Sequence, residues 1–319
     1  LPFFHYFMAF FNLIFPITLI AKILPNLLLS TLTITVFFIS KKITSNENAS
    51  LFSAGIVSFL PILFSTNHFA PITLFLPLLF LNIYAFMNLK QPNHLYLYLI
   101  TFFLLSFTSS ATSLLIMGFG IYLVLSYTEG KKIKREEIEL IIFSLFFFVW
   151  TQFIFFKNLF LTQGISFIWQ NIPTKIITEY FPQFTILDAL ITVSIIPFLI
   201  GIFVVYRSLF KLKGQKAFLL ISFAISTTLL TWFKFIEFQL ALSFFGIILA
   251  ILFAIFYKDA INYLKSTKLP RLKKPFIMTI IILLLLTTVY PALNNALQQQ
   301  TPENDEIAAF SWLKENTPK

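Results

Sequence analysis

The 319-residue chain contains no cysteine, only eight glycines and three histidines, and charged residues make up just 11% of it. Without cysteine there are no disulfide bonds, thiolate metal sites or cysteine nucleophiles. The glycines form neither a GxGxxG motif nor a P-loop, and the histidines lie far apart without HExxH spacing. The familiar nucleotide-binding, zinc-hydrolase and thiol-based chemistries are therefore excluded.

Carboxylates are scarce as well. Asp188, Asp259 and Asp305 are the only aspartates, and no two acidic residues in the apolar part are spaced for metal binding or general-base catalysis. The residues alone therefore reveal no catalytic centre.

The composition instead indicates a membrane protein. Hydrophobic residues make up 58% of the chain, and its charged fraction is less than half of the roughly 25% found in soluble domains. The net charge of +10 does not indicate nucleic-acid binding, because the basic residues lie in short connections between apolar runs. We expect membrane lipid, and no nucleic acid, among the partners.

Apolar runs of membrane-spanning length predict an all-α, polytopic transmembrane bundle of about ten spans. Residues 2–15 are too short to cross and predict a juxtamembrane or partial helix on the outer side. A run of hydroxyl residues, 108–113, divides two of the spans. The predicted spans are 20–41, 49–65, 69–89, 95–109, 110–127, 137–157, 185–208, 216–233, 236–258 and 274–293.

The basic stretch 129–139, EGKKIKREEIE, sets the orientation of the chain. Its four basic residues cannot lie in a bilayer interior, and the positive-inside bias places them in the cytoplasm. With the other connections assigned by alternation, 17 of the 23 basic residues fall on this side and five on the other, with Lys22 remaining. We therefore predict an integral protein, of the cell membrane, with an extracytoplasmic C-terminus.

Two regions are predicted to lie outside. The connection 158–188 is long for such a protein and carries Trp169 and Lys175, which predicts one or two helices lying at the interface. Thr301 and Pro302 predict the start of an amphipathic helix. Residues 1–299 would then form the transmembrane domain and 300–319 the start of an external soluble domain. Because the chain lacks an initiator Met, we expect it to be a fragment of a longer protein.

Few charged residues lie near the predicted outer ends of spans. Lys234 and Glu237 are three residues apart, as on one helix face, and predict either an interfacial ion pair or a cation that meets an anionic head group. We expect His5, beside Tyr6, to be either a residue packed at the membrane interface or a residue that contacts a ligand. Lys175 and Glu179 are spaced to pair on a helix.

Both ends of the chain resemble one enzyme family. The succession PFFHYFMA at 2–9, AKILPNLL at 21–28 and KKIT at 41–44 resembles the segments that follow the first external loop of GT-C membrane glycosyltransferases. The tail AAFSWLKENTP at 308–318 resembles the helix that opens their external C-terminal domain.

This resemblance implies transfer of a sugar from a polyprenyl-phosphate carrier, as in mannosyltransferases of this type, to an acceptor on the outer face. The family's acidic loop, which supplies the base or a divalent-metal ligand, would precede Leu1, so no catalytic residue is assigned and residues 1–319 alone are expected to be inactive. The family also has an arginine near the outer end of a late span. Residues 235–239 have none, and Lys234 would replace it. The expected substrate-binding residues are Lys234, Glu237, Lys175, Trp169 and His5.

Other functions remain open. A multi-pass secondary transporter would show internal repeats and broken helices carrying polar groups. An oligosaccharyltransferase would share the tail motif, and a polymerase- or ligase-type envelope enzyme would share the lipid-linked substrate. The sequence does not identify the donor sugar or the acceptor.

Overall fold

The computed structural model describes residues 2–67, 69–164, 186–212, 214–267 and 270–299, together with Ser311 and Trp312. In these ranges the chain is all-α, as predicted. The α-helices are α1 (Phe3–Asn12), α2 (Ile17–Thr44), α3 (Glu47–Ser58), α4 (Pro61–Ser65), α5 (Pro71–Phe86), α6 (Pro92–Thr108), α7 (Ser113–Thr128), α8 (Arg135–Gln163), α11 (Ile186–Val193), α12 (Ile195–Arg207), α13 (Gln215–Trp232), α14 (Phe238–Ser266), α15 (Lys273–Leu284) and α16 (Tyr290–Gln299). Short turns of 3-10 or π helix are η1 (Ser110–Thr112), η3 (Ser208–Leu212), η4 (Pro270–Leu272) and η5 (Leu285–Val289).

Five helical segments of the described chain are long and apolar enough to cross a membrane, which makes this an integral membrane protein. The other predicted spans correspond to shorter or interrupted helices, so the count of ten stays a prediction. The five segments are Ile17–Thr44, Ser110–Thr128, Arg135–Thr162, Phe238–Ser266 and Lys273–Leu297.

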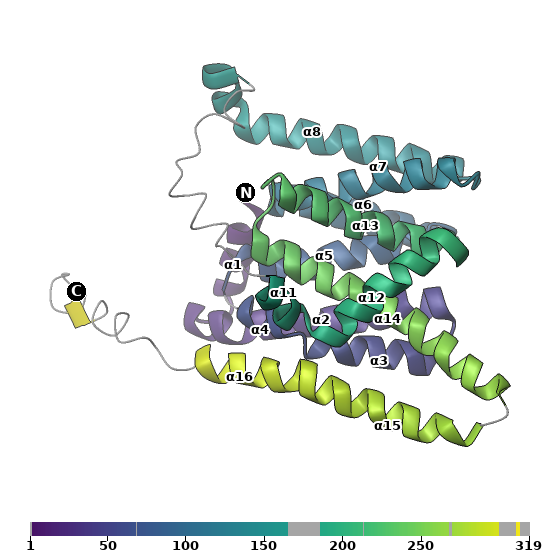
Figure 1. Cartoon of the computed structure of the whole chain (residues 1–319). Coiled ribbons are helices and arrows are strands. Elements are labelled where there is room, and N and C mark those ends of the chain that lie inside the picture. Colours follow the sequence, from purple (N-terminus) through teal and green to yellow (C-terminus); the bar gives the residue numbers. More distant parts are fainter. Residues whose placement is uncertain are drawn as a thin grey trace.

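Helix α14 is the central element of the bundle. Of its most apolar stretch 78% is buried, against 17% for α8 and for the segment formed by α15, η5 and α16. It packs against α2, α3, α12 and α13, while α8 and α15 lie at opposite edges (Figure 1). Because α14 contacts elements from both halves of the chain, it joins them into one core.

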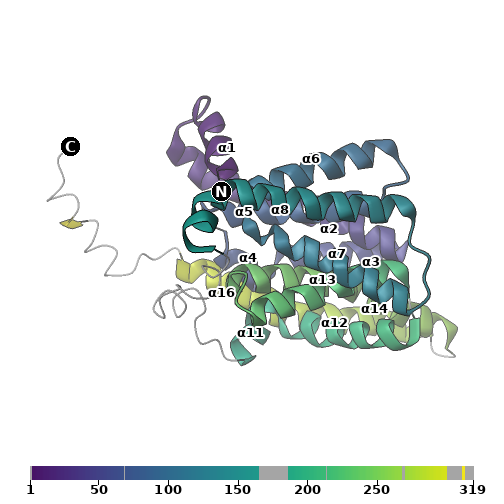
Figure 2. The same ribbon diagram turned by 90° about the horizontal axis from the view of Figure 1, so that it is seen from above.

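The basic connections meet at one end of the bundle. Lys42 at the end of α2, Lys90 between α5 and α6, Lys134 before α8 and Lys216 at the start of α13 line one hollow. The last residues of α14 and the first of α15 lie at the same end, and α1, α4 and α11 lie at the other (Figures 1 and 2). We call these the lysine end and the opposite end.

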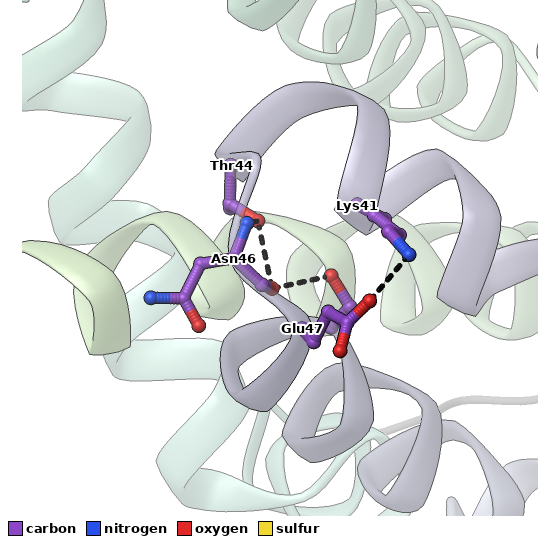
Figure 3. Close-up of polar contacts among 5 residues, drawn as sticks. Lys41, Thr44, Asn46 and Glu47 are labelled. Atoms are coloured by element: carbon purple, nitrogen blue, oxygen red, sulfur yellow. Dashed lines mark hydrogen bonds and ion pairs between the residues drawn. The ribbon is translucent and has the colours of Figure 1, made fainter.

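The turn between α2 and α3 shows how the chain reverses at the lysine end (Figure 3). Ser45 takes a left-handed conformation (φ 53°), and the Asn46 side chain caps α3 by accepting from the Ala49 N–H at 3.1 Å. The Lys41 ammonium donates to Glu47 Oε1 at 2.6 Å and, by this hydrogen bond and its charge, lowers the pKa of the Glu47 carboxyl.

The predicted division between α6 and α7 is confirmed. Ser109 is extended and its hydroxyl accepts from the Ala111 N–H at 3.1 Å, which starts η1. Helix α1 confirms a short first helix. The chain breaks at residues 13–16, and the continuous α2, with Pro25 inside it, covers the predicted span 20–41.

Small residues and hydroxyl groups hold neighbouring helices together, as expected where apolar surface gives no preference for protein over lipid. The Ser53 hydroxyl, itself accepting from Ser40, donates to the carbonyl of Ala250 at 2.8 Å, linking α2, α3 and α14. Helices α7 and α13 approach closely at Gly118, where an added Cβ would overlap the buried ring of Phe223.

Gly118→Ala is expected to destabilise the bundle by about 1–3 kcal/mol, because the ring of Phe223 must move in a packed core. The matched control is Gly120→Ala on the same helix, where no atom lies within 4 Å of the added Cβ. The control should be neutral or more stable by up to about 1 kcal/mol, the helix propensity gained. Unfolding by SDS titration in mixed micelles measures both, and equal effects would contradict the close approach.

Candidate functional site

The side of the bundle carries an apolar groove between α3 and the segment formed by α15 and η5, which we call the lateral groove. Its volume is about 320 Å³, within the range of small-molecule sites. Among the described residues Thr288 is the one polar side chain that lines it. The lining residues are Leu51, Phe52, Gly55, Ile56, Phe59, Ile281, Leu284, Leu285, Thr288 and Val289.

The lateral groove opens on the exposed outer surface of the bundle. Leu51, Phe59 and Leu285 are exposed large hydrophobic residues. No atom lies within 4 Å of a Cβ added at Gly55, so the missing side chain keeps part of the groove empty. The groove is therefore suited to an apolar chain that enters from the bilayer.

A polar cluster lies beside the groove, where the helical run 186–207 is broken. Ser194 separates α11 from α12 with φ 74° and ψ 125°, a conformation that L-residues rarely adopt. Its hydroxyl donates to the carbonyl of Thr287 at 3.0 Å and lies 2.6 Å from Thr288 Oγ1. Because the Ser194 proton is engaged, Thr288 is the donor in the second bond.

The partner of Ser194 is irregular too. Thr287 and Thr288 belong to η5, a single turn of π-helix between α15 and α16. Such turns are rare and occur often at functional sites. Both Ser194 and Thr288 are almost fully buried, at 0% and 1% exposure, so irregular backbone from two elements is paired inside the protein.

The groove leads toward the opposite end of the bundle. Phe59, at the end of α3, precedes α4, and the Gln239 side chain in the first turn of α14 donates to the carbonyl of Ser65 at 3.1 Å. Helix α16 also packs on α4. These contacts place α4 between the groove and the first turn of α14, which follows the turn carrying Lys234 and Glu237.

Lys234 and Glu237 are not on one helix face, so that expectation is wrong. Lys234 has φ 58° in the turn after α13, and Glu237 is the N-cap residue of α14. The turn closes because the Phe235 N–H donates to the carbonyl of Leu230 at 2.8 Å, which ends α13. Both charged side chains are exposed at the opposite end.

His5 lies at the same end. It is exposed on α1, which packs against the connection before α5 through Phe4 and Phe69, with ring centroids 5.7 Å apart. Trp169 and Lys175 lie outside the described residues, as do the predicted interfacial helices of that connection. The predicted tail helix also lies outside them, except for Ser311 and Trp312, which are helical.

The described chain holds no group of three His, Asp or Glu side chains placed to bind a metal ion. None of its residues is therefore assigned to the divalent metal that the family resemblance implies, and no chemical step is assigned to such an ion.

Comparison with models of protein families gives no match. Comparison with curated proteins gives none either. The resemblance to GT-C transferases therefore stays a prediction.

The sequence reasoning missed the break at Ser194, because the apolar run continues on both sides of it. One signal was present, since Pro197 lies in the first turn of α12, where proline favours a helix start. No pattern in the sequence indicated that Gly55 borders a groove, because that groove forms only where α15 and η5 lie beside α3.

The backbone at Ser194 generates a comparison of two variants. Ser194→Ala loses the two hydroxyl contacts and keeps the strained φ, whereas Ser194→Gly loses the same contacts and relieves the strain. We expect Ser194→Ala to be less stable than Ser194→Gly by about 1 kcal/mol or more. Thermal unfolding in detergent measures the difference, and an alanine variant as stable as the glycine variant would show that Ser194 is unstrained.

Proposed function

We propose that the chain is the membrane-embedded part of a GT-C-type glycosyltransferase that takes a sugar from a polyprenyl-phosphate carrier at the extracytoplasmic face. The observation that carries this proposal is the lateral groove, an apolar slot beside a membrane-spanning segment that leads toward the end bearing Lys234. The resemblance of the two chain ends to this family supports it.

The orientation in this proposal follows from the distribution of charge. Connections rich in lysine gather at one end, which the positive-inside bias assigns to the cytoplasm. The opposite end, with Lys234, Glu237 and His5, then faces outward, where the resemblance expects the transfer to occur. The predicted ten spans are part of this proposal.

Donor recognition divides into an apolar part and a charged part. The isoprenoid chain lies in the lateral groove, since each buried CH₂ group contributes about 0.8 kcal/mol. The phosphate is held at the opposite end with Lys234 as a point charge, without the paired donors of an arginine. Glu237 and His5 lie at the same end and are proposed to border the sugar.

One observation favours a second candidate, a secondary transporter. The break between α11 and α12 at Ser194 is the kind of discontinuous helix that transporters use to bind substrates. Its described polar partners are hydroxyl and carbonyl groups only. Such oxygens can coordinate a cation, but here the two hydroxyls and the carbonyl are bonded to one another, so the transferase is favoured.

The absence of cysteine makes the orientation directly testable. Lys157→Cys, exposed near the end of α8, should react in intact cells with a membrane-impermeant maleimide, because it is placed outside. Lys132→Cys, in the α7–α8 connection, should react only after the cells are opened. Reaction of both on the same side would exclude the proposed topology.

Binding of the donor lipid tests the groove. Residues 1–319 in neutral-lipid nanodiscs should bind decaprenyl phosphate saturably, measured by native mass spectrometry. Gly55→Leu, which fills the groove, should weaken binding about tenfold, equal to about 1.4 kcal/mol. Lys234→Gln should weaken binding of decaprenyl phosphate severalfold and leave binding of uncharged decaprenol unchanged.

Two variants serve as controls for this experiment. Gly120→Leu adds the same side chain where no atom lies within 4 Å of the added Cβ, and Lys157→Gln removes an exposed charge from α8. Neither should change affinity. If decaprenyl phosphate does not bind saturably, or Gly55→Leu binds it as well as the parent chain does, the groove is not its site.

A further inference from the structure

The lysine end contains a hollow that the proposed transferase activity does not use. Its volume is about 420 Å³, and its lining comes from the ends of α2 and α5, the α5–α6 connection, α7 and the starts of α8 and α13. Four lysines and one glutamate line it, a net charge of +3. We call it the lysine hollow; the charged residues are Lys42, Lys90, Lys134, Lys216 and Glu137.

No lysine of this hollow forms an ion pair with a carboxylate of the described chain. Within the described ranges the ion pairs join Lys41 to Glu47, Arg135 to Glu139 and Arg207 to Asp259, so no carboxylate oxygen lies within 4 Å of a lysine of the hollow. The Lys216 ammonium is close enough to those of Lys42 and Lys90 to be repelled by both. It donates to the carbonyl of Lys42 at 2.8 Å, which holds it toward α2.

The polar side chains on the α7 side of the hollow form hydrogen bonds with one another. Gln215 donates to the Tyr122 hydroxyl at 2.9 Å, and that hydroxyl donates to Glu137 Oε2 at 3.0 Å. The three side chains come from α13, α7 and α8, so they fix the positions of these helices around the hollow. The Glu137 carboxylate is also attracted by Lys134, which leaves Lys42, Lys90 and Lys216 as the uncompensated group.

Topology alone does not explain this arrangement. The positive-inside bias is satisfied by any lysine in a connection, as by exposed Lys132 and Lys274, which are outside the lining. Gathering three ammonium groups from three connections around one hollow costs repulsion. A bound anion removes that cost.

We propose that the lysine hollow binds a ligand carrying a phosphate or diphosphate group. The three uncompensated charges match a multiply charged anion, since a phosphate monoester carries about −1.5 to −2 at pH 7 and a carboxylate only −1. Lysine suits this task as a flexible point charge with three donors. Phosphate groups reach this end of the bundle either on a lipid head group of the adjacent leaflet or on a soluble molecule.

The test uses the 319-residue chain in neutral phosphatidylcholine nanodiscs, with one arm for each source of phosphate. Inorganic pyrophosphate is titrated by isothermal calorimetry, and dioleoyl phosphatidic acid is added to the nanodiscs and counted by native mass spectrometry. Saturable binding is expected in at least one arm. The double variant Lys90→Gln/Lys216→Gln should weaken it at least tenfold.

The matched control is Lys132→Gln/Lys274→Gln, which removes two exposed charges at the same end without touching the hollow and should change affinity less than twofold. Binding of pyrophosphate alone identifies a soluble ligand, and binding of phosphatidic acid alone a lipid head group. No saturable binding in either arm, or an equal loss in the control, would overturn the proposal. Neither result depends on decaprenyl phosphate at the other end.

Discussion

The structure depends on one constraint, that an ammonium group cannot lie in an apolar interior unless it is paired. Seventeen of the 23 basic residues fall in connections that the sequence assigns to one side, and the described connections among them gather at one end of the bundle. The apolar helices can then pack without buried charge. The same constraint brings lysines from separate connections to one end, where packing gathers Lys42, Lys90 and Lys216 around the lysine hollow.

Within the bundle, close approach and hydroxyl contacts replace the hydrophobic driving force of a soluble core. At Gly201 of α12 an added Cβ would come within 3.2 Å of the Leu249 backbone, so α12 lies almost directly on α14. Ser194 performs a related task at the start of the same helix, where its hydroxyl ties the break to η5. This contact fixes the position of η5, whose Thr288 also lines the lateral groove.

Local pattern predicted the positions of helices well and their interactions poorly. The division at Ser109 was readable, because hydroxyl residues interrupt two apolar runs and cap the next turn. The break at Ser194 was hidden, because Val193 and Ile195 continue the apolar pattern and only a contact with Thr288, 94 residues away, reveals its role.

Lys234 and Glu237 had helical spacing, but the tertiary turn between α13 and α14 overrode it. The convergence of Lys42, Lys90 and Lys216 follows from packing, and spacing along the chain carries no sign of it.

Helix α8 departs from helical geometry at Phe156, where φ is −104° and ψ is 15°. The first residues of α8 include Arg135 and three glutamates, which stay outside the hydrocarbon, and from Leu140 to Phe155 the helix rises about 24 Å at 1.5 Å per residue, against a hydrocarbon thickness of about 30 Å. The bend, directly before Lys157, therefore lies near the outer edge of the hydrocarbon, and the last two turns can follow the membrane surface. A thicker bilayer would draw this bend inward and a thinner one would tilt the straight part, so this outer helix responds to hydrophobic mismatch before the central α14 does.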